Sequence, residues 1–194
     1  MFTNSETTRQ FIARHFRKRR TPLTEAAILE AIAAPRSKYD VYWGVLALRD
    51  CGTARSVPAL KGLLHYPMQD VKDCSLLTIA RIAGAAETPF YLEALALKGS
   101  RKTYPMWAIE AAADARAIPA VVELVNAALR KANRPKPADP GDAYLSGLKF
   151  FARMGLDRPE FQSSLDLLTK AWPNLAEGHR TVLSGILPGS DQRR

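Results

Sequence analysis

Apolar residues along the chain recur at the three- and four-residue spacing of helices. Five segments show this spacing clearly: PLTEAAILEAIAA, PALKGLLHY, PFYLEALAL, PAVVELVNAALRKA and PEFQSSLDLLTKA, which begin at Pro22, Pro58, Pro89, Pro119 and Pro159. Proline is tolerated at the first helical position, because the N–H that it lacks would have no partner there. No segment shows the two-residue alternation that is typical of a strand. The pattern therefore predicts an all-α chain.

A second set of helical segments precedes the last four of these. Their endings are ALRDCG, IARIAG, IEAAAD and FFARMG, with Asp114 in the place of the third glycine. Gly52, Gly84 and Gly155 thus stand where helices commonly end in a left-handed turn. The five prolines are 36, 31, 30 and 40 residues apart. Helix pairs repeated at such intervals predict an α-solenoid.

The repeat resembles the HEAT family, and in particular the short bacterial HEAT-like repeats. The alanine, leucine and glycine residues of ALRDCG and IARIAG carry this resemblance, which covers residues 22–187. The third unit departs from the pattern because it lacks the glycine, and the fourth because it has an insertion around RPKPADPG. The resemblance implies an α-solenoid of about five antiparallel helix pairs, whose second helices line a concave face.

Three parts of the chain can be distinguished. We predict a basic N-terminal capping helix in residues 1–21, the helical repeat domain in residues 22–187 and a flexible tail in residues 188–194. In the first part, Asn4 and Ser5 are candidates for the helix N-cap. Phe11, Ile12 and Phe16 can share one face, which we expect to pack on the first repeat.

The N-terminal helix is strongly basic. Against a single glutamate it carries Arg9, Arg14, Arg17, Lys18, Arg19 and Arg20. These side chains would give the terminal repeat the polar outer side that it needs. Two alternatives stay open: the same cluster could neutralise the phosphates of a nucleic acid, or it could form an organellar targeting peptide.

Composition narrows the class of protein. The chain has 194 residues, 47% of them hydrophobic, and a formal net charge of +9. Its longest apolar runs are far shorter than the roughly 20 residues that cross a bilayer, so we expect no membrane partner and a cytoplasmic location. Cys51 and Cys74 are not spaced for a metal or a disulfide framework, and we expect both to be small buried groups. The charge favours an acidic partner.

Basic residues gather in the predicted turns inside the helix pairs. Such turns line one edge of a solenoid, and a stripe of one sign there attracts an acidic partner. The residues that we predict to bind a partner at this basic edge are Lys98, Arg101, Lys102, Arg130, Lys131, Arg134 and Lys136. An alternative explanation is the helix dipole, since three of them lie near predicted helix C-termini, where cations are favoured.

The concave face implied by the resemblance is a second candidate surface. Arg49 and Arg81 each stand three residues before a closing glycine, so stacked repeats would bring them side by side. Paired guanidinium groups bind carboxylates or phosphates. We also place Trp107 on this face. The aromatic pairs Tyr42–Trp43 and Tyr104–Trp107 either stack unpaired bases or belong to the core.

No motif for catalysis is recognisable in the sequence. It contains no P-loop, no G-x-S-x-G and no pair of histidines four residues apart, and its three histidines lie in distant segments. We therefore expect a non-enzymatic protein with no cofactor and no metal. A minor alternative is an activity like that of the HEAT-like alkylpurine DNA glycosylases, with Trp43 and Trp107 as the tryptophans and Asp50 or Glu110 as the carboxylate.

These observations favour a HEAT-like scaffold or adaptor that binds an acidic protein partner through its concave face or its basic edge. Assembly factors and immunity proteins belong to the same class. The alternative is an α-solenoid that binds nucleic acid through the N-terminal cluster and the basic edge.

Overall fold

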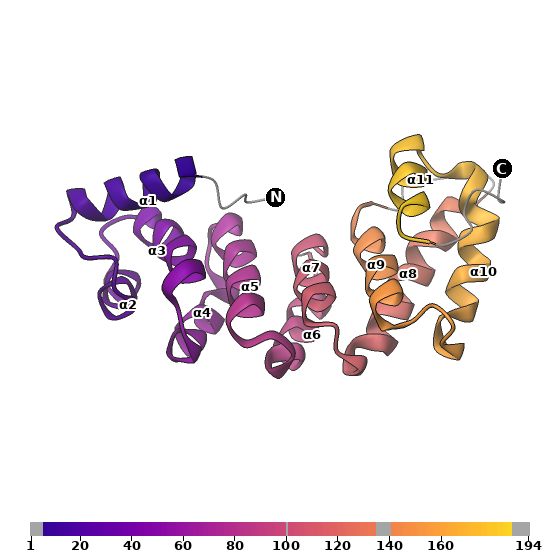
Figure 1. The fold of residues 1–194 in the computed structure, drawn as a ribbon, viewed down its shortest axis with the longest axis horizontal. Coiled ribbons are helices and arrows are strands. Elements are labelled where there is room, and N and C mark those ends of the chain that lie inside the picture. Colours follow the sequence, from indigo (N-terminus) through magenta and orange to yellow (C-terminus); the bar gives the residue numbers. More distant parts are fainter. Residues whose placement is uncertain (1–5, 100, 135–140, 188–194) are drawn as a thin grey trace. The chain divides into compact units, whose positions relative to one another are not determined.

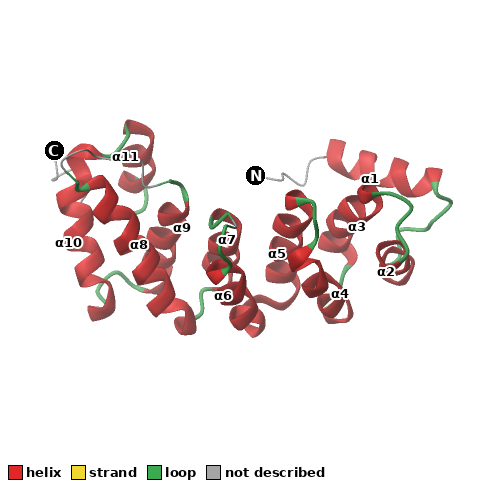
Figure 2. Ribbon diagram, turned by 180° about the vertical axis from the view of Figure 1, so that it is seen from behind, coloured by secondary structure: helices red, strands yellow, loops and turns green. Residues whose placement is uncertain are grey.

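The computed structural model describes residues 6–99, 101–134 and 141–187, and these residues form helices joined by short turns (Figure 1). No strand occurs in these ranges (Figure 2), so the all-α prediction is confirmed. None of the helices in them has the length and the apolar character that crossing a membrane requires. The contacts between elements divide the chain into two compact units, residues 1–90 and residues 91–194.

Unit 1 is built around one central helix. Its α-helices are α1 (Glu6–Lys18), α2 (Glu25–Ala33), α3 (Lys38–Cys51), α4 (Val57–Lys61) and α5 (Gln69–Ala83), and its 3₁₀ turns are η1 (Ala54–Ser56), η2 (Gly62–His65) and η3 (Gly84–Glu87). Helix α3 packs against α1, α2 and α5, and α4 packs against α5 (Figure 1). The core between these helices includes the fully buried Phe16, Ile28, Leu48 and Ile79.

In unit 2, too, helices pack on helices that are near them along the chain. Its elements are α6 (Thr88–Ala96), which begins in unit 1, α7 (Thr103–Ala112), η4 (Ala115–Ala117), α8 (Ile118–Ala132), α9 (Ala143–Met154), η5 (Pro159–Phe161), α10 (Gln162–Ala171), η6 (Trp172–Asn174) and α11 (Glu177–Ser184). Helix α9 packs against α7, α8 and α11, and α8 also packs against α10. In the core, the rings of Phe151 and Phe161 stack with their centroids 4.1 Å apart.

The prolines begin helices much as the sequence predicts. Pro58, Pro89 and Pro119 are the second residues of α4, α6 and α8, and Pro159 opens η5, which leads directly into α10. Helix α2 starts three residues after Pro22 with no 3₁₀ turn between them, because the hydroxyl of Thr24 caps the helix by accepting from the backbone N–H of Ala27. A 3₁₀ turn precedes each of α4, α6, α8 and α10, which the sequence analysis did not predict.

The helix ends differ from one another. Gly84 and Gly155 have the predicted positive φ, 52° and 97°. The prediction is wrong for Gly52, whose φ is −72°; glycine is needed there because a Cβ would collide with the carbonyl oxygen of Leu48 and the side chain of Ile82. In the third sequence repeat, which lacks the closing glycine, Ala113 takes the left-handed conformation, with φ 48°. Asp114 then caps η4 by accepting a hydrogen bond from the backbone N–H of Arg116.

Two predictions of burial need correction. Ile12 and Phe16 of α1 are buried as expected, but Phe11 of the same helix is 50% exposed and does not share their face. Cys74 is buried, whereas Cys51 at the end of α3 is exposed. The N-cap candidates Asn4 and Ser5 and the tail of residues 188–194 lie outside the described residues.

Candidate functional site

Unit 2 contains a pocket of about 590 Å³ between α6, α8 and the first turn of α9. This volume falls within the range of about 300–1,000 Å³ that is typical of ligand sites. The residues that line it are Leu92, Leu95 and Ala96 of α6, Lys102 just before α7, Ala120, Glu123, Leu124, Ala127, Ala128 and Lys131 of α8, and Ala143 and Tyr144 of α9.

The wall of the pocket is mostly apolar, and several of the side chains that α8 contributes to it are small. Ala120, Ala127 and Ala128 present only methyl groups, which leaves space between α6 and α8. Ala96 and Ala127 are exposed, and Leu92 and Leu124 are half-buried. Apolar surface that can be reached from solvent therefore lines the pocket.

Lys102 is held in place at this pocket by hydrogen bonds. It stands at the N-cap of α7, and its ammonium group donates to the carbonyl oxygens of Leu95 and Leu97, each 2.6 Å away. These carbonyls lie at the C-terminal end of α6, where a cation is favoured by the helix dipole. Two of the three N–H donors of the ammonium are used in this way.

Lys131 supplies a second positive charge, from the last turn of α8. Its side chain is exposed, and Glu123 lines the pocket from two turns earlier on the same helix. Two lysines against one glutamate leave the lining of the pocket positive. An apolar pocket bordered by fixed positive charge suits a ligand that is both apolar and acidic.

The structure places the other residues of the predicted basic edge in the same unit. Lys98 and Arg101 are exposed in the connection between α6 and α7, and Arg130 and Arg134 are exposed at the C-terminal end of α8. Lys136 lies outside the described residues. Of the predicted edge, Lys102 and Lys131 are thus brought together at the pocket.

The predicted concave-face residues are distributed over both units. Arg49 on α3 is half-buried and Arg81 on α5 is exposed, and these two helices pack on each other in unit 1. The charge of Arg49 reaches Cys74 on α5, where burial raises the pKa of the thiol to about 12 and the arginine opposes that rise. Trp107 belongs to unit 2, where its ring meets that of Tyr104 edge to face, with centroids 4.9 Å apart.

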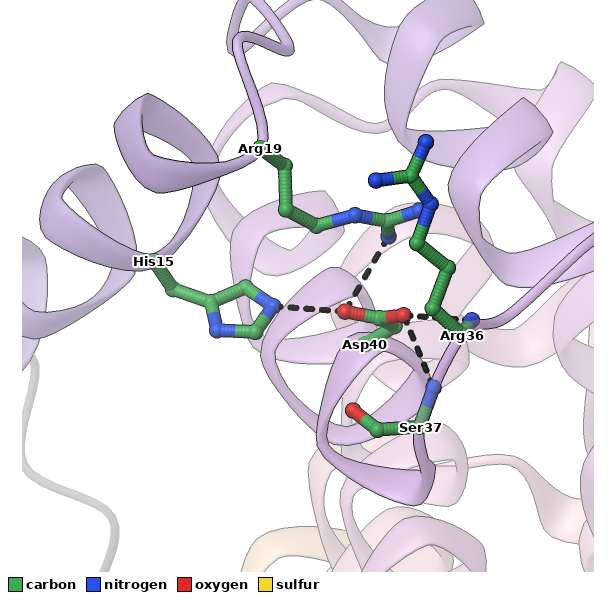
Figure 3. A network of polar contacts seen from close by, with 5 residues as sticks. All are labelled: His15, Arg19, Arg36, Ser37 and Asp40. Carbon is green, nitrogen blue, oxygen red and sulfur yellow. Dashed lines mark hydrogen bonds and ion pairs between the residues drawn. The ribbon is translucent and has the colours of Figure 1, made fainter.

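A polar network in unit 1, which sequence reasoning missed, centres on Asp40 (Figure 3). Asp40 is the third residue of α3 and only 2% exposed. Its Oδ1 lies 2.8 Å from Nε2 of His15 and 3.1 Å from Nη1 of Arg19, both on the segment that begins with α1. Its Oδ2 accepts from the backbone N–H groups of Arg36, at 2.6 Å, and Ser37, at 3.0 Å.

The network keeps the buried carboxylate ionised. Burial alone would raise the pKa of Asp40, but the contacts with His15, Arg36 and Ser37 and the charge of Arg19 outweigh it and hold the pKa below its usual value. The ionised group joins α1 to the start of α3. The spacing of Ser37 and Asp40 is that of a capping box. From this spacing, the contact of Asp40 with the backbone at the start of α3 could have been predicted from the sequence.

The carboxylates considered for a glycosylase-like activity have different surroundings. Asp50 is exposed, with Nε of Arg9 4.0 Å away. Glu110 on α7 is half-buried; burial raises its pKa, against the opposing influence of Lys149, Ser146 and Arg153. Trp43 lies in unit 1 with Asp50, and Trp107 in unit 2 with Glu110. Within the described ranges, no three acidic, histidine or cysteine residues are grouped as metal ligands would be.

Comparison with known proteins identifies no relative of the chain. No protein-family model matches it, and no match is found among the curated proteins or the solved structures. The HEAT resemblance is therefore one of sequence pattern. What the structure establishes is an all-helical chain in which neighbouring helices pack on one another.

Proposed function

We propose that the chain is a non-enzymatic, HEAT-like scaffold that binds an acidic, amphipathic segment of a partner protein at the unit 2 pocket. The observation that carries the proposal is the position of Lys102 and Lys131 at an apolar pocket of about 590 Å³. An adaptor, an assembly factor and an immunity protein would all use such a site. The alternation of helix pairs and the packing of neighbours within each unit support the HEAT-like α-solenoid.

The apolar lining supplies the affinity in this proposal. Leucine and alanine side chains of α6 and α8 are accessible in the pocket, and burying them against apolar side chains of a partner is favourable by roughly 25 cal/mol per Å². An amphipathic helix laid into an apolar groove is a recurring mode of peptide recognition.

The two lysines supply the preference for acidic partners. Lys102 is fixed by its bonds to the end of α6, and Lys131 can adjust because it is exposed. Carboxylates on the partner would meet both, whereas a basic segment would bring like charges together, which is strongly unfavourable. The exposed Lys98, Arg130 and Arg134 in the same unit would speed the encounter with an acidic partner.

The test uses a library of random 15-residue peptides displayed on phage and selected against the immobilised full chain. We expect the selected peptides to combine apolar residues with aspartate or glutamate. One of them, made synthetically, should bind Lys131→Glu about tenfold more weakly than the wild type, because a favourable charge becomes repulsive. It should bind Ala127→Trp hardly at all, because the indole fills the pocket. Isothermal titration calorimetry measures both effects.

Lys170→Glu provides the matched control, since Lys170 is an exposed lysine of α10 that does not line the pocket. This variant should bind the peptide almost as the wild type does. Selected peptides without acidic residues, or peptides that bind Ala127→Trp as tightly as the wild type, would refute the proposal.

A further inference from the structure

A second surface, independent of the pocket, lies where α1 crosses α3 in unit 1. Arg9 near the start of α1 lies 4.0 Å from Asp50 near the end of α3, and His15 lies 2.8 Å from Asp40 near its start. The two helices are therefore antiparallel. Helical spacing places Phe11, Arg14 and Lys18 together on α1, and Tyr39 and Trp43 together on α3. We call these five residues the aromatic surface.

Two rings of this surface are unusually accessible, and the third, that of Trp43, is half-buried. Phe11 is 50% and Tyr39 is 52% exposed, and the other exposed large hydrophobic side chains in the described ranges, Leu23 and Val182, are less open and lie elsewhere. The rings of Phe11 and Trp43 are nearly parallel, at 16°, with centroids 6.2 Å apart. Apolar side chains that are exposed side by side, and not scattered singly, are typical of an interaction site.

Cations accompany the exposed rings. The guanidinium of Arg14 lies 5.7 Å from the centroid of Phe11, and the ammonium of Lys38 lies 5.4 Å from that of Tyr39. Arg17 and Lys18 are also exposed on α1. The surface therefore carries positive charge on both of its helices.

Acidic groups do little to offset this charge. Glu6 is the one acidic residue between residues 6 and 20, which include six arginines and lysines. Asp40 is buried and held by His15, Arg19 and two backbone N–H groups (Figure 3). Asp50 lies beside Arg9. The potential at the aromatic surface is thus set by its cations.

We propose that the aromatic surface binds single-stranded nucleic acid. Unpaired bases would stack on the rings of Tyr39, Phe11 and Trp43, and the phosphates between them would meet Arg14, Lys18 and the neighbouring cations. Aromatic rings interleaved with cations form the usual platform for single strands, because every base has a face to stack. A duplex would use only the cations, since its bases are already stacked on each other.

The test measures fluorescence anisotropy of the full chain with labelled dU12, labelled rU12 and a labelled duplex of 12 base pairs. We expect both single strands to bind more tightly than the duplex. With four phosphates neutralised by Arg14, Arg17, Lys18 and Lys38, affinity for the single strand should fall by about fiftyfold between 50 and 200 mM salt. A preference for rU12 over dU12 would assign the ligand as RNA through its 2′-hydroxyl groups, and the reverse would assign it as DNA.

Variants separate this surface from general basicity. Tyr39→Ala should weaken single-strand binding by about tenfold through the loss of one stacked base, without changing duplex binding. Arg14→Glu with Lys18→Glu should weaken both. The matched controls lie in unit 2: Val182→Ala removes another exposed apolar side chain, and the double variant Arg130→Glu, Arg134→Glu reverses the same number of exposed charges. Both controls should bind as the wild type does, and circular dichroism verifies that every variant is folded.

Three results would overturn the proposal. One is the absence of single-strand binding at 50 mM salt. In the second, the double variant Arg130→Glu, Arg134→Glu no longer binds the single strand and Tyr39→Ala binds it as the wild type does, so that the binding is nonspecific attraction to phosphate. The third is displacement of dU12 by poly-glutamate at equal charge concentration, which would make the aromatic surface a site for acidic protein. None of these results bears on the pocket in unit 2, which the peptide experiment tests separately.

Discussion

Asp40 shows how one carboxylate can determine where a helix lies. It is almost inaccessible to solvent, yet it accepts hydrogen bonds from two backbone N–H groups at the start of its own helix and faces His15 of α1 and Arg19, which follows α1. A buried charge with these partners is stable, whereas a buried charge that has lost its partner is costly. Arg19 is itself largely buried, with 14% of its side chain exposed. The pair therefore fixes the end of α1 against α3.

Asp40→Asn should lower the free energy of unfolding at pH 7 by about 3 kcal/mol, because it leaves Arg19 without a counter-charge. The pKa of Asp40 is lowered in the folded protein, so its contribution is present above the unfolded pKa and is lost as the pH falls through the folded pKa. The difference between variant and wild type should accordingly shrink in acid. Urea unfolding at a series of pH values measures it. Asp166→Asn, at an exposed aspartate of α10, serves as the control, and a constant difference down to the lowest pH would contradict the prediction.

Glu110 should behave in the opposite way. Its pKa is raised, mainly by burial, so the folded protein holds this proton more tightly than the unfolded chain does. Stability is then lost as the pH rises above the unfolded pKa of about 4.3. Glu110→Gln should raise the melting temperature at pH 7 and leave it unchanged near pH 3. Thermal unfolding followed by circular dichroism checks this, and a lower melting temperature at pH 7 would show that its attraction to Lys149 and Arg153 outweighs burial.

At the scale of elements, the two helices of a pair approach closely at a glycine. Gly44 of α3 and Gly147 of α9 each stand eight residues before the glycine that closes their helix. A Cβ on Gly44 would lie 2.7 Å from Cγ1 of Ile32 on α2, and one on Gly147 would collide with Val125 on α8. The same device thus sets the spacing of a helix pair in both units.

Gly147→Ala should therefore destabilise the protein by about 1–3 kcal/mol through overpacking. Adding Val125→Ala should relieve the collision. The double variant should therefore lose less stability than the sum of the losses in Gly147→Ala and Val125→Ala measured separately. Gly178 on α11 has no atom near the place of a Cβ, so Gly178→Ala should be neutral or stabilising by up to about 1 kcal/mol. Chemical denaturation of the four variants measures these changes. Equal losses at Gly147 and Gly178 would argue against close packing as the cause.

The helices could be predicted from the sequence because prolines, glycines and apolar spacing are local signals. Pro58, Pro89 and Pro119 stand at the predicted helix starts, and Gly84 and Gly155 at the predicted helix ends. The 3₁₀ turns escaped prediction because three or four residues are too few to show a period. Gly52 was misjudged because glycine is needed there for close contacts, with the carbonyl oxygen of Leu48 and with Ile82 thirty residues away, and not for a left-handed turn.

The candidate sites could be predicted only in part, for a related reason. Lys102 and Lys131 were identified from their charge, but the apolar pocket between them depends on how α6 and α8 pack. The contacts of Asp40 with His15 and Arg19 likewise depend on the antiparallel placement of α1 on α3. Phe11 was assigned to the wrong face because apolar character alone does not separate a core residue from an exposed one.

At the scale of the whole molecule, both units are basic. Residues 1–90 contain 13 arginines and lysines against 8 acidic residues, and residues 91–194 contain 15 against 11. The net charge of +9 is therefore divided between the two units, and each unit has a surface of its own on which positive charge could attract an acidic ligand. In unit 1 the charge lies beside exposed aromatic rings, and in unit 2 it lies beside an apolar pocket. The two surfaces differ in the chemistry next to the charge.

The two hydrogen bonds that tether Lys102 affect the entropy of binding. A lysine side chain normally samples many rotamers, and ordering it on binding costs up to about 2 kcal/mol. Lys102 is already ordered by the carbonyl oxygens of Leu95 and Leu97, so that cost has been met during folding. A carboxylate that reaches it loses little of its binding energy to ordering the protein. Lys131, which is exposed at the end of α8, has this ordering still to undergo.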